Sequence, residues 1–256
     1  MKGKPSQNTV LITGAAGGIG AGLVTALAEA GWGVLGTDHP SAQPTNDVRK
    51  YCENWIAADL ATLSHDSQQL NAFRASVFSA TGNDKLVAIV HNAALQQLDT
   101  FEHLEATNWH QTLEINLLAP VVINRALLPE LKRHRGSIVH IGSIHSQLTK
   151  PGFTAYATSK AALAGLTRAM AVELGGSVRV NAIEPAAIST PMLEAGFADN
   201  PALRAQLEAF HPTDAIGRPE DVARAVLFLL DPANSFLNGC VLPLGGGIHN
   251  RLHDPA

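Results

Sequence analysis

Short apolar stretches alternate with longer stretches of helical periodicity along most of this chain. The short stretches are almost wholly apolar and do not alternate with polar residues. This pattern is typical of strands buried on both faces of a parallel sheet between two helical layers. It predicts strands over residues 9–13, 33–37, 55–58, 86–91, 137–141, 178–183 and 240–242.

The longer stretches carry apolar residues three, four or seven positions apart, as in Ile19, Leu23 and Leu27. That spacing gives a helix one apolar stripe, which can pack on a sheet. Regular alternation of strands and helices requires right-handed crossovers and yields a doubly wound sheet. We therefore expect an α/β fold with a single domain over residues 1–256: a Rossmann-type, doubly wound parallel sheet of about seven strands with helices on both faces.

Charge and cysteine content limit the partners and the compartment. The chain has 18 Lys and Arg against 22 Asp and Glu, a net charge of −4. Nucleic acids and anionic membranes attract concentrated positive charge, so neither is expected as a partner. Cys52 and Cys240 lie far apart and form no C-x-x-C pair, which favours the reducing cytoplasm. The uncharged run 10–28 has the length of a membrane span, but its glycines argue against both a span and a signal peptide.

A glycine-rich segment joins the first predicted strand to the first predicted helix. It contains Gly14, Gly18 and Gly20 within the sequence Thr-Gly-Ala-Ala-Gly-Gly-Ile-Gly. Glycines at this place allow a sharp turn and let a pyrophosphate approach backbone N–H groups at the helix N-terminus. The strand and helix around it make a dinucleotide site the favoured interpretation.

Asp38 ends the second predicted strand, 18 residues after Gly20. A carboxylate there can accept hydrogen bonds from the ribose hydroxyls and would repel a 2′-phosphate. Neither Ala15 nor Ala16 offers a basic group for that phosphate, so NAD is favoured over NADP. The alternative for Asp38 is a turn or cap residue.

Tyr156 and Lys160 share one face of an alanine-rich predicted helix because they are four residues apart. A phenol has a pKa of about 10, so its use as a base near neutrality requires a lowering of roughly 3 units, which an adjacent ammonium can supply. Ser143 ends the fifth predicted strand, where open parallel sheets bind ligands, and its hydroxyl could polarise a carbonyl. Taken singly, these residues could be a surface pair and a turn serine.

In combination, these motifs resemble the short-chain dehydrogenase/reductase family over nearly the whole chain. The pattern T-G-x-x-x-G-I-G is met at residues 13–20, and the other matching residues follow in family order: Asp59 and Leu60, Asn92, Asn116, Ser143, Tyr156 and Lys160.

The resemblance implies an NAD(P)-dependent short-chain alcohol dehydrogenase or ketone reductase that assembles as a homo-oligomer, a tetramer. It implies Tyr156 as the general acid/base, Lys160 as the residue that lowers its pKa, Ser143 as the holder of the substrate oxygen, and Asn116 as the support of a proton-relaying water. The residues it implies at the cofactor are Gly14, Gly18, Ile19, Gly20, Asp38, Asp59, Leu60, Asn92, Tyr156, Lys160, Ile188 and Thr190.

Three residues depart from the family pattern. Ala94 and Ala186 replace usual glycines, and Gly245 replaces a common aspartate in the C-terminal turn. We expect the added methyl groups to cause small shifts without loss of cofactor binding.

The irregular segment 185–212 is expected to be either a lid over the substrate or a surface excursion with a small helix. The loops 95–98, 144–148 and 187–197 mix apolar and polar residues without an arginine cluster. They favour a small to medium, partly polar secondary alcohol or its ketone as the substrate.

Other functions fit the sequence less well. The 11 histidines include no H-E-x-x-H, so no metal is predicted, and residues 141–145 do not form the G-x-S-x-G of a serine hydrolase. A non-catalytic dinucleotide-sensing protein on the same fold remains an alternative. Such a protein would not need the tyrosine and the lysine.

Overall fold

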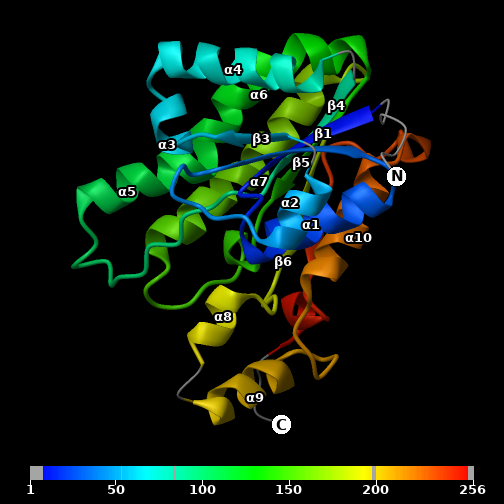
Figure 1. Cartoon of the computed structure of the whole chain (residues 1–256). Helices are drawn as coiled ribbons and strands as arrows, with labels where there is room; N and C mark the ends of the chain where they lie inside the picture. The colour runs from blue at the N-terminus through cyan, green and yellow to red at the C-terminus, as the bar shows by residue number, and fades with distance from the viewer. Residues whose placement is uncertain (1–7, 53, 83–84, 198–199, 253–256) are drawn as a thin grey trace.

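The computed structural model describes residues 8–52, 54–82, 85–197 and 200–252, and they form one parallel sheet between two layers of helices (Figure 1). The strand order is β3-β2-β1-β4-β5-β6-β7, and every pairing is parallel. The predicted doubly wound α/β fold is therefore confirmed. The strands are β1 (Asn8–Thr13), β2 (Gly33–Asp38), β3 (Asn54–Ala57), β4 (Lys85–His91), β5 (Ser137–Ile141), β6 (Arg179–Pro185) and β7 (Val241–Leu244).

All seven predicted strands are present, and none of their ends is displaced by more than two residues. The largest differences are at the ends of β6 and β7, which continue to Pro185 and Leu244. Both strands extend beyond the apolar residues from which they were predicted. They do so because residues 182–185 of β6 pair with residues 241–244 of β7 in the sheet.

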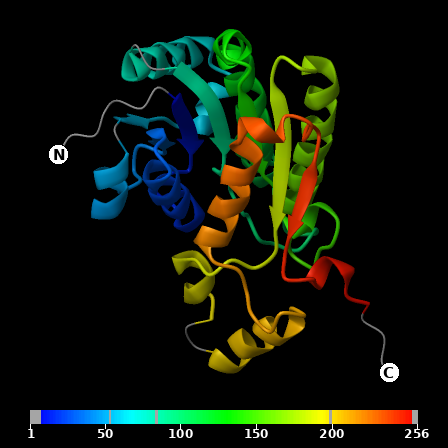
Figure 2. The same cartoon turned by 90° about the vertical axis from the view of Figure 1, so that its right-hand side faces the viewer.

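Each face of the sheet has its own apolar core. Ile12 and Val90 pack with Leu23 and Val226 beneath α1 and α10, and Leu11 and Ile89 pack with α4, α6 and α7 on the other face. Figure 2 shows α1 and α10 together on one side of the sheet. The helices are α1 (Gly18–Glu29), α2 (Asn46–Tyr51), α3 (Leu60–Leu63), α4 (Ser67–Thr81), α5 (Ala106–Leu113), α6 (Ala119–Arg133), α7 (Thr154–Leu174), α8 (Pro191–Ala195), α9 (Pro201–Phe210) and α10 (Pro219–Leu230).

Two short irregular helices interrupt this pattern near the carboxyl ends of the strands. A π-helical turn, η1 (Glu114–Leu118), joins α5 to α6, and a 3-10 turn, η2 (Ile144–Ser146), follows β5. π-Helical turns occur often at functional sites. Both turns carry or adjoin residues that the sequence singles out.

The segment 185–212 leaves the end of β6 and contains α8 and α9, which project beyond the carboxyl edge of the sheet (Figures 1 and 2). Thr190 and Asn200 cap the two helices, and a proline follows each cap. Ala198 and Asp199 of this predicted lid lie outside the described residues. Its action as a lid stays a prediction.

None of the helices in the described part of the chain is both long enough and apolar enough to cross a membrane.

Candidate active site

The parallel sheet brings the residues predicted from separate motifs to its carboxyl edge. The chain leaves β1 towards β2 and leaves β4 towards β5, so the boundary between β1 and β4 is a topological switch point, the place where open α/β sheets bind ligands. The glycine turn follows β1, Asp38 ends β2, Asn92 follows β4 and Ser143 follows β5. Segments far apart in the sequence therefore meet at one edge.

The glycine turn is tightly closed on the start of α1. A Cβ atom at Gly20 would lie 2.0 Å from the carbonyl oxygen of Gly14, so no larger residue fits there without moving the backbone. Thr190 reaches the same turn, since a Cβ atom at Gly18 would lie 2.8 Å from the Cβ of Thr190. Ile19 follows in the first turn of α1 and is half-buried. Backbone N–H groups at this helix start suit a diphosphate.

Asp38 bridges the end of β2 and the glycine turn. Its Oδ2 accepts a hydrogen bond from the backbone N–H of Ala16 at 2.9 Å, and its Oδ1 accepts one from that of His39 at 2.8 Å. Each carboxylate oxygen can accept a further hydrogen bond. The side chain thus has the capacity to bind ribose hydroxyls at a fixed position, and the residues around it fit an adenosine ribose.

Asn92 joins the loop after β4 to the loop after β1. Its Nδ2 donates to the carbonyl oxygens of Thr13 and Gly14, at 3.2 and 2.9 Å. The hydroxyl of Thr13 in turn accepts hydrogen bonds from the backbone N–H groups of Asn92 and Ala93. Asn92 therefore fixes the glycine turn by hydrogen bonds, and these bonds occupy its side-chain nitrogen.

The remaining predicted cofactor residues follow strands β3 and β6. Asp59 caps α3 and accepts from Ala61 N–H and the Thr62 hydroxyl, and Leu60 is buried behind it. Ile188 is buried where the chain leaves β6 and pairs with Gly217.

Tyr156 and Lys160 lie on one face of α7, as their spacing predicts. The Nζ of Lys160 lies 5.6 Å from the centre of the Tyr156 ring and donates to the carbonyl oxygen of Ile141 at 2.8 Å. Burial lowers the pKa of Lys160 to about 8, because the buried ammonium is poorly solvated. Burial raises the pKa of the Tyr156 phenol, and a hydrogen bond with Ser143 opposes that rise. A lowering of the Tyr156 pKa by Lys160 stays a prediction.

Asn116 lies in the π-helical turn and links the loop after β4 to α7. Its Oδ1 accepts from the backbone N–H of Leu95 at 2.7 Å, and its Nδ2 donates to the Leu95 carbonyl and to Ser159 Oγ, both at 2.9 Å. Ser159 Oγ donates to the carbonyl oxygen of Tyr156 at 2.7 Å. The side chain of Asn116 is thus occupied by protein groups, and its predicted support of a water is untested.

His145 lies beside the tyrosine, in the turn that Ser143 begins. Its ring stacks on Phe153 with centres 4.2 Å apart and meets the Tyr156 ring edge-on at 5.8 Å. Its backbone N–H donates to Ser143 Oγ, and its Nδ1 pairs with the hydroxyl of Thr149. Burial, with a smaller contribution from the Lys150 ammonium, lowers the pKa of His145 to about 4. The ring is therefore neutral at physiological pH.

A buried pair of histidines lies behind the site. His91 ends β4 and His140 lies in β5, and their rings are 5.3 Å apart. His91 Nε2 pairs with Asn124 Oδ1 at 2.7 Å, and His140 Nδ1 pairs with Thr167 Oγ1 at 2.8 Å. Burial lowers the pKa of His91 to about 4, and it lowers that of His140 together with the charges of His91 and Lys160.

Two of the departures from the family pattern prove to be neighbours. A Cβ atom at Gly245 would lie 2.8 Å from the Cβ of Ala186 and 2.7 Å from the ring of His249. The methyl group at Ala186 and the imidazole of His249 together fill the space that a side chain at position 245 would need. The sequence motifs gave no sign of this pairing, because the residues are 59 positions apart.

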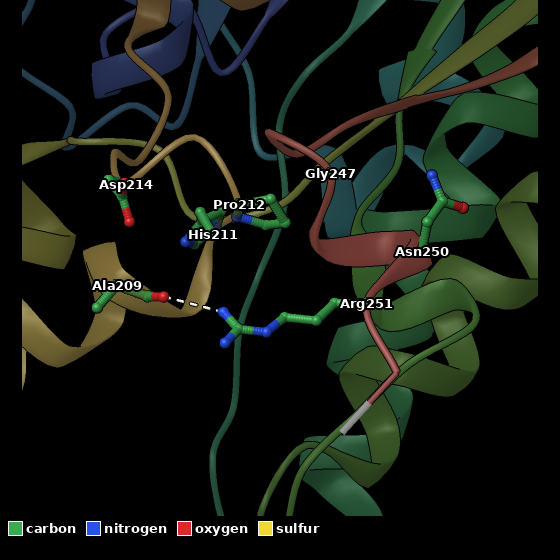
Figure 3. A pocket seen from close by; sticks show the side chains of 7 residues that line it. All are labelled: Ala209, His211, Pro212, Asp214, Gly247, Asn250 and Arg251. Atoms are coloured by element: carbon green, nitrogen blue, oxygen red, sulfur yellow. Dashed lines mark hydrogen bonds between the residues drawn. The ribbon is translucent and has the colours of Figure 1, made fainter. Parts of the chain in front are cut away.

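A hollow of about 490 Å³ lies between the end of α9 and the C-terminal segment (Figure 3). Arg251 lies across it and donates from one nitrogen to the carbonyl oxygens of Ala209 and Phe210, at 2.9 and 2.8 Å. None of the predicted site residues lines this hollow. Within the described ranges, no three His, Cys, Asp or Glu side chains are grouped to hold a metal ion.

Sequence reasoning missed Ser159, Glu184 and the His91–His140 pair as parts of this region. One signal was present for Glu184, which is a carboxylate directly after an apolar run. Ser159 lies between the two predicted catalytic residues of α7, so its position could also have suggested a role.

Comparison with known families and sequences gives consistent matches over almost the entire chain. A family model described as Enoyl-(Acyl carrier protein) reductase matches residues 14–249. An oxidoreductase of Schizosaccharomyces pombe is 33% identical over 242 residues, which cover 93% of this chain and 90% of the relative. Cyclopentanol dehydrogenase of Comamonas sp. is 31% identical over 255 residues, covering 96% and 98% of the two chains.

A similar structure is that of the aldohexose dehydrogenase of Thermoplasma acidophilum in its ligand-free form. It superposes with a TM-score of 0.86 at 27% identity and covers 98% of this chain and 97% of its own. The architecture is thus shared over the whole length.

The buried histidines predict a loss of stability in acid. His91 has its ordinary pKa of 6.5 when unfolded and about 4 when folded, so the unfolded chain binds the proton first as the pH falls. Its contribution is complete above pH 6.5 and declines towards pH 4, where about 3 kcal/mol of the free energy of unfolding is lost. Denaturant titrations at several pH values should show a shallower decline for His91→Gln. The exposed His39→Gln serves as the control, and a His91→Gln curve parallel to wild type would contradict the assignment.

Proposed function

Since the chain belongs to the short-chain dehydrogenase/reductase family, whose oxidoreductases use a nicotinamide cofactor, we propose that it transfers a hydride between NAD and a secondary alcohol or its ketone, with Tyr156 as the general acid/base. The observation that carries this proposal is the arrangement of Ser143, Tyr156 and Lys160 at the carboxyl edge of the sheet, next to the glycine turn. A binding protein that only sensed the dinucleotide would have no use for that arrangement.

The cofactor, when bound, supplies the carbon that accepts or donates the hydride. Gly14, Gly18, Ile19 and Gly20 would hold its diphosphate with Thr190, as the helix start and the proximity of Thr190 support. The other proposed contacts are Asp38 to the ribose, Asp59 and Leu60 to the adenine, and Ile188 and Lys160 towards the nicotinamide end. Asn92 is proposed to shape the sheet edge near the cofactor.

Proton transfer is the task proposed for the side chains of α7 and the turn after β5. The Ser143 hydroxyl holds the substrate oxygen by a hydrogen bond, and Tyr156 takes the proton of the alcohol, or returns it to the ketone. Lys160 supports the phenolate with its charge. Asn116 keeps the loop after β4 against α7, and its turn is the proposed place of a water that relays protons to Lys160.

Two relatives support the choice of an alcohol or ketone, since their names describe cyclopentanol and aldohexose dehydrogenases. The loops around His145 carry both apolar and polar side chains, which suits a partly polar substrate of small to medium size. Location in the cytoplasm stays a prediction that rests on the sequence, in which Cys52 and Cys240 form no C-x-x-C pair.

Replacement of Tyr156 tests the mechanism. We expect Tyr156→Phe to lower kcat by about 10²–10⁴-fold, the range for loss of a general acid/base, while the Kd for NADH stays unchanged. A panel of alcohols with NAD, and of ketones with NADH, followed by nicotinamide absorbance, first identifies a substrate. Tyr51→Phe, which changes the exposed phenol near Glu29, is the matched control. Undiminished turnover in Tyr156→Phe would refute the mechanism, and NADH binding without turnover of any substrate would favour the sensor.

Replacement of Asp38 tests the cofactor preference. Asp38→Asn removes the negative charge that opposes a 2′-phosphate and keeps one acceptor oxygen. At an effective dielectric constant between those of protein and water, that repulsion is worth about 1–4 kcal/mol. The ratio of kcat/KM for NAD to that for NADP should therefore fall at least about fivefold. Asp47→Asn, on the exposed side of α2, should leave the ratio unchanged. A wild-type enzyme that uses both cofactors equally would contradict the proposal.

We also propose that the protein assembles as a homotetramer. Large apolar side chains are exposed in η1, on α6, α7 and α10, and after α10. Burial of this apolar surface between copies of the chain would stabilise an assembly. Light scattering at micromolar concentration should give a mass near four times 26.9 kDa, and a monomer mass would refute the assembly. The exposed side chains are Leu118, Val121, Val172, Phe228 and Phe236.

A further inference from the structure

Glu184 is a fully buried carboxylate near the end of β6, and the proposed reaction gives it no task. Its relative exposure is 0%, although an ionised carboxylate is costly to bury without partners. The strand around it is otherwise apolar from Ala182 to Pro185. A carboxyl group kept at this position therefore needs specific partners.

The partners of Glu184 come from the turn that follows Ser143. Ser146 Oγ donates to Glu184 Oε1, and Gln147 Nε2 donates to Oε2 at 2.9 Å. The side chain passes under the backbone of Gly142, where an added Cβ would lie 3.0 Å from Glu184 Cγ. Glu184 thus holds the turn after Ser143 by two hydrogen bonds, with one carboxylate oxygen for Ser146 and the other for Gln147.

That turn carries the groups nearest to the reacting atoms. Ser143 begins it, and the Ser143 hydroxyl both accepts from the backbone N–H of His145 and pairs with the Tyr156 phenol. His145 lies between Ser146 and Ser143 in sequence, with its ring against Phe153 and Tyr156. A shift of Ser146 would therefore move both the serine hydroxyl and the imidazole.

The C-terminal segment brings a titratable group towards this region. Burial lowers the pKa of His249, and the Glu184 carboxylate opposes that shift. The Nε2 of His249 has no hydrogen-bond partner among the described residues. The contacts of Glu184 itself are with the turn after β5 and with the backbone of Gly142.

We propose that Glu184 is a positioning residue that anchors the turn 144–147, and through it sets the Ser143 hydroxyl and the His145 ring against the substrate. This role rests on the proposed function for its catalytic consequence. The anchoring itself is a property of the folded chain and can be measured without a substrate.

Two substitutions separate anchoring from charge. Glu184→Leu removes both acceptors, whereas Glu184→Gln keeps one oxygen for Ser146 and can pair its amide with a rotated Gln147 amide. Displacement of reacting groups by about 1 Å costs on the order of 10²-fold, so Glu184→Leu should lose about that much in kcat/KM for the alcohol. The Kd for NADH should not change, and Glu184→Gln should keep most of the wild-type kcat/KM. The exposed Glu173→Leu on α7 is the matched control.

Hydrogen exchange followed by mass spectrometry supplies the second measurement. Peptides covering residues 143–148 should exchange faster in Glu184→Leu, with wild-type rates elsewhere. If Glu184→Leu does not fold, Ser146→Ala and Gln147→Leu each remove one donor and should show the same local effect to a smaller degree.

Three results would overturn the proposal. They are an equal loss in Glu184→Gln and Glu184→Leu, unchanged exchange at residues 143–148, and faster exchange throughout the chain. Absence of turnover in the wild-type protein would count against the proposed function instead, because the exchange measurement would still report on the anchor.

Discussion

Hydrogen bonds and one short backbone segment fix the glycine turn relative to Tyr156. Asn92 donates to the carbonyl oxygen of Gly14, and Leu95, three residues after Asn92, is held by Asn116. Asn116 in turn donates to Ser159 on α7, and Ser159 donates to the carbonyl oxygen of Tyr156. Hydrogen bonds between buried or partly buried groups are costly to break, so the protein sets the position of the glycine turn relative to Tyr156 before any ligand arrives.

Much of the fold could be predicted because its signals are local. The apolar strands and the glycine turn are contiguous in sequence, and each follows from the periodicity or the backbone geometry of a few residues. Tyr156 and Lys160 could be paired for the same reason, since four residues make one helical turn. The ends of β6 and β7 could be predicted less closely, because Pro185 and Leu244 belong to the sheet through their pairing with each other, which the sequence does not reveal.

The parts that sequence could not supply are contacts between distant segments. Glu184 meets Gln147 across 37 positions, and His91 meets Asn124 across 33. Neither contact has a spacing rule, since each depends on how a strand packs against a segment distant in sequence. The same applies to Ala186 and Gly245, which in the sequence are two unrelated departures from the family pattern. In the structure, the methyl group of Ala186 occupies space that a side chain at position 245 would need.

The contact of Arg251 with the end of α9 has a consequence for exchanging segments between homologous enzymes. This guanidinium donates hydrogen bonds to the carbonyl oxygens of Ala209 and Phe210. The last described residues are therefore attached to the C-terminal end of α9. A chimaera that moves residues 185–212 of this chain into a homologue without the counterpart of Arg251 would lose that attachment. Transplanted substrate preference should therefore travel with both pieces, although Arg251 lies 41 positions after Phe210 along the chain.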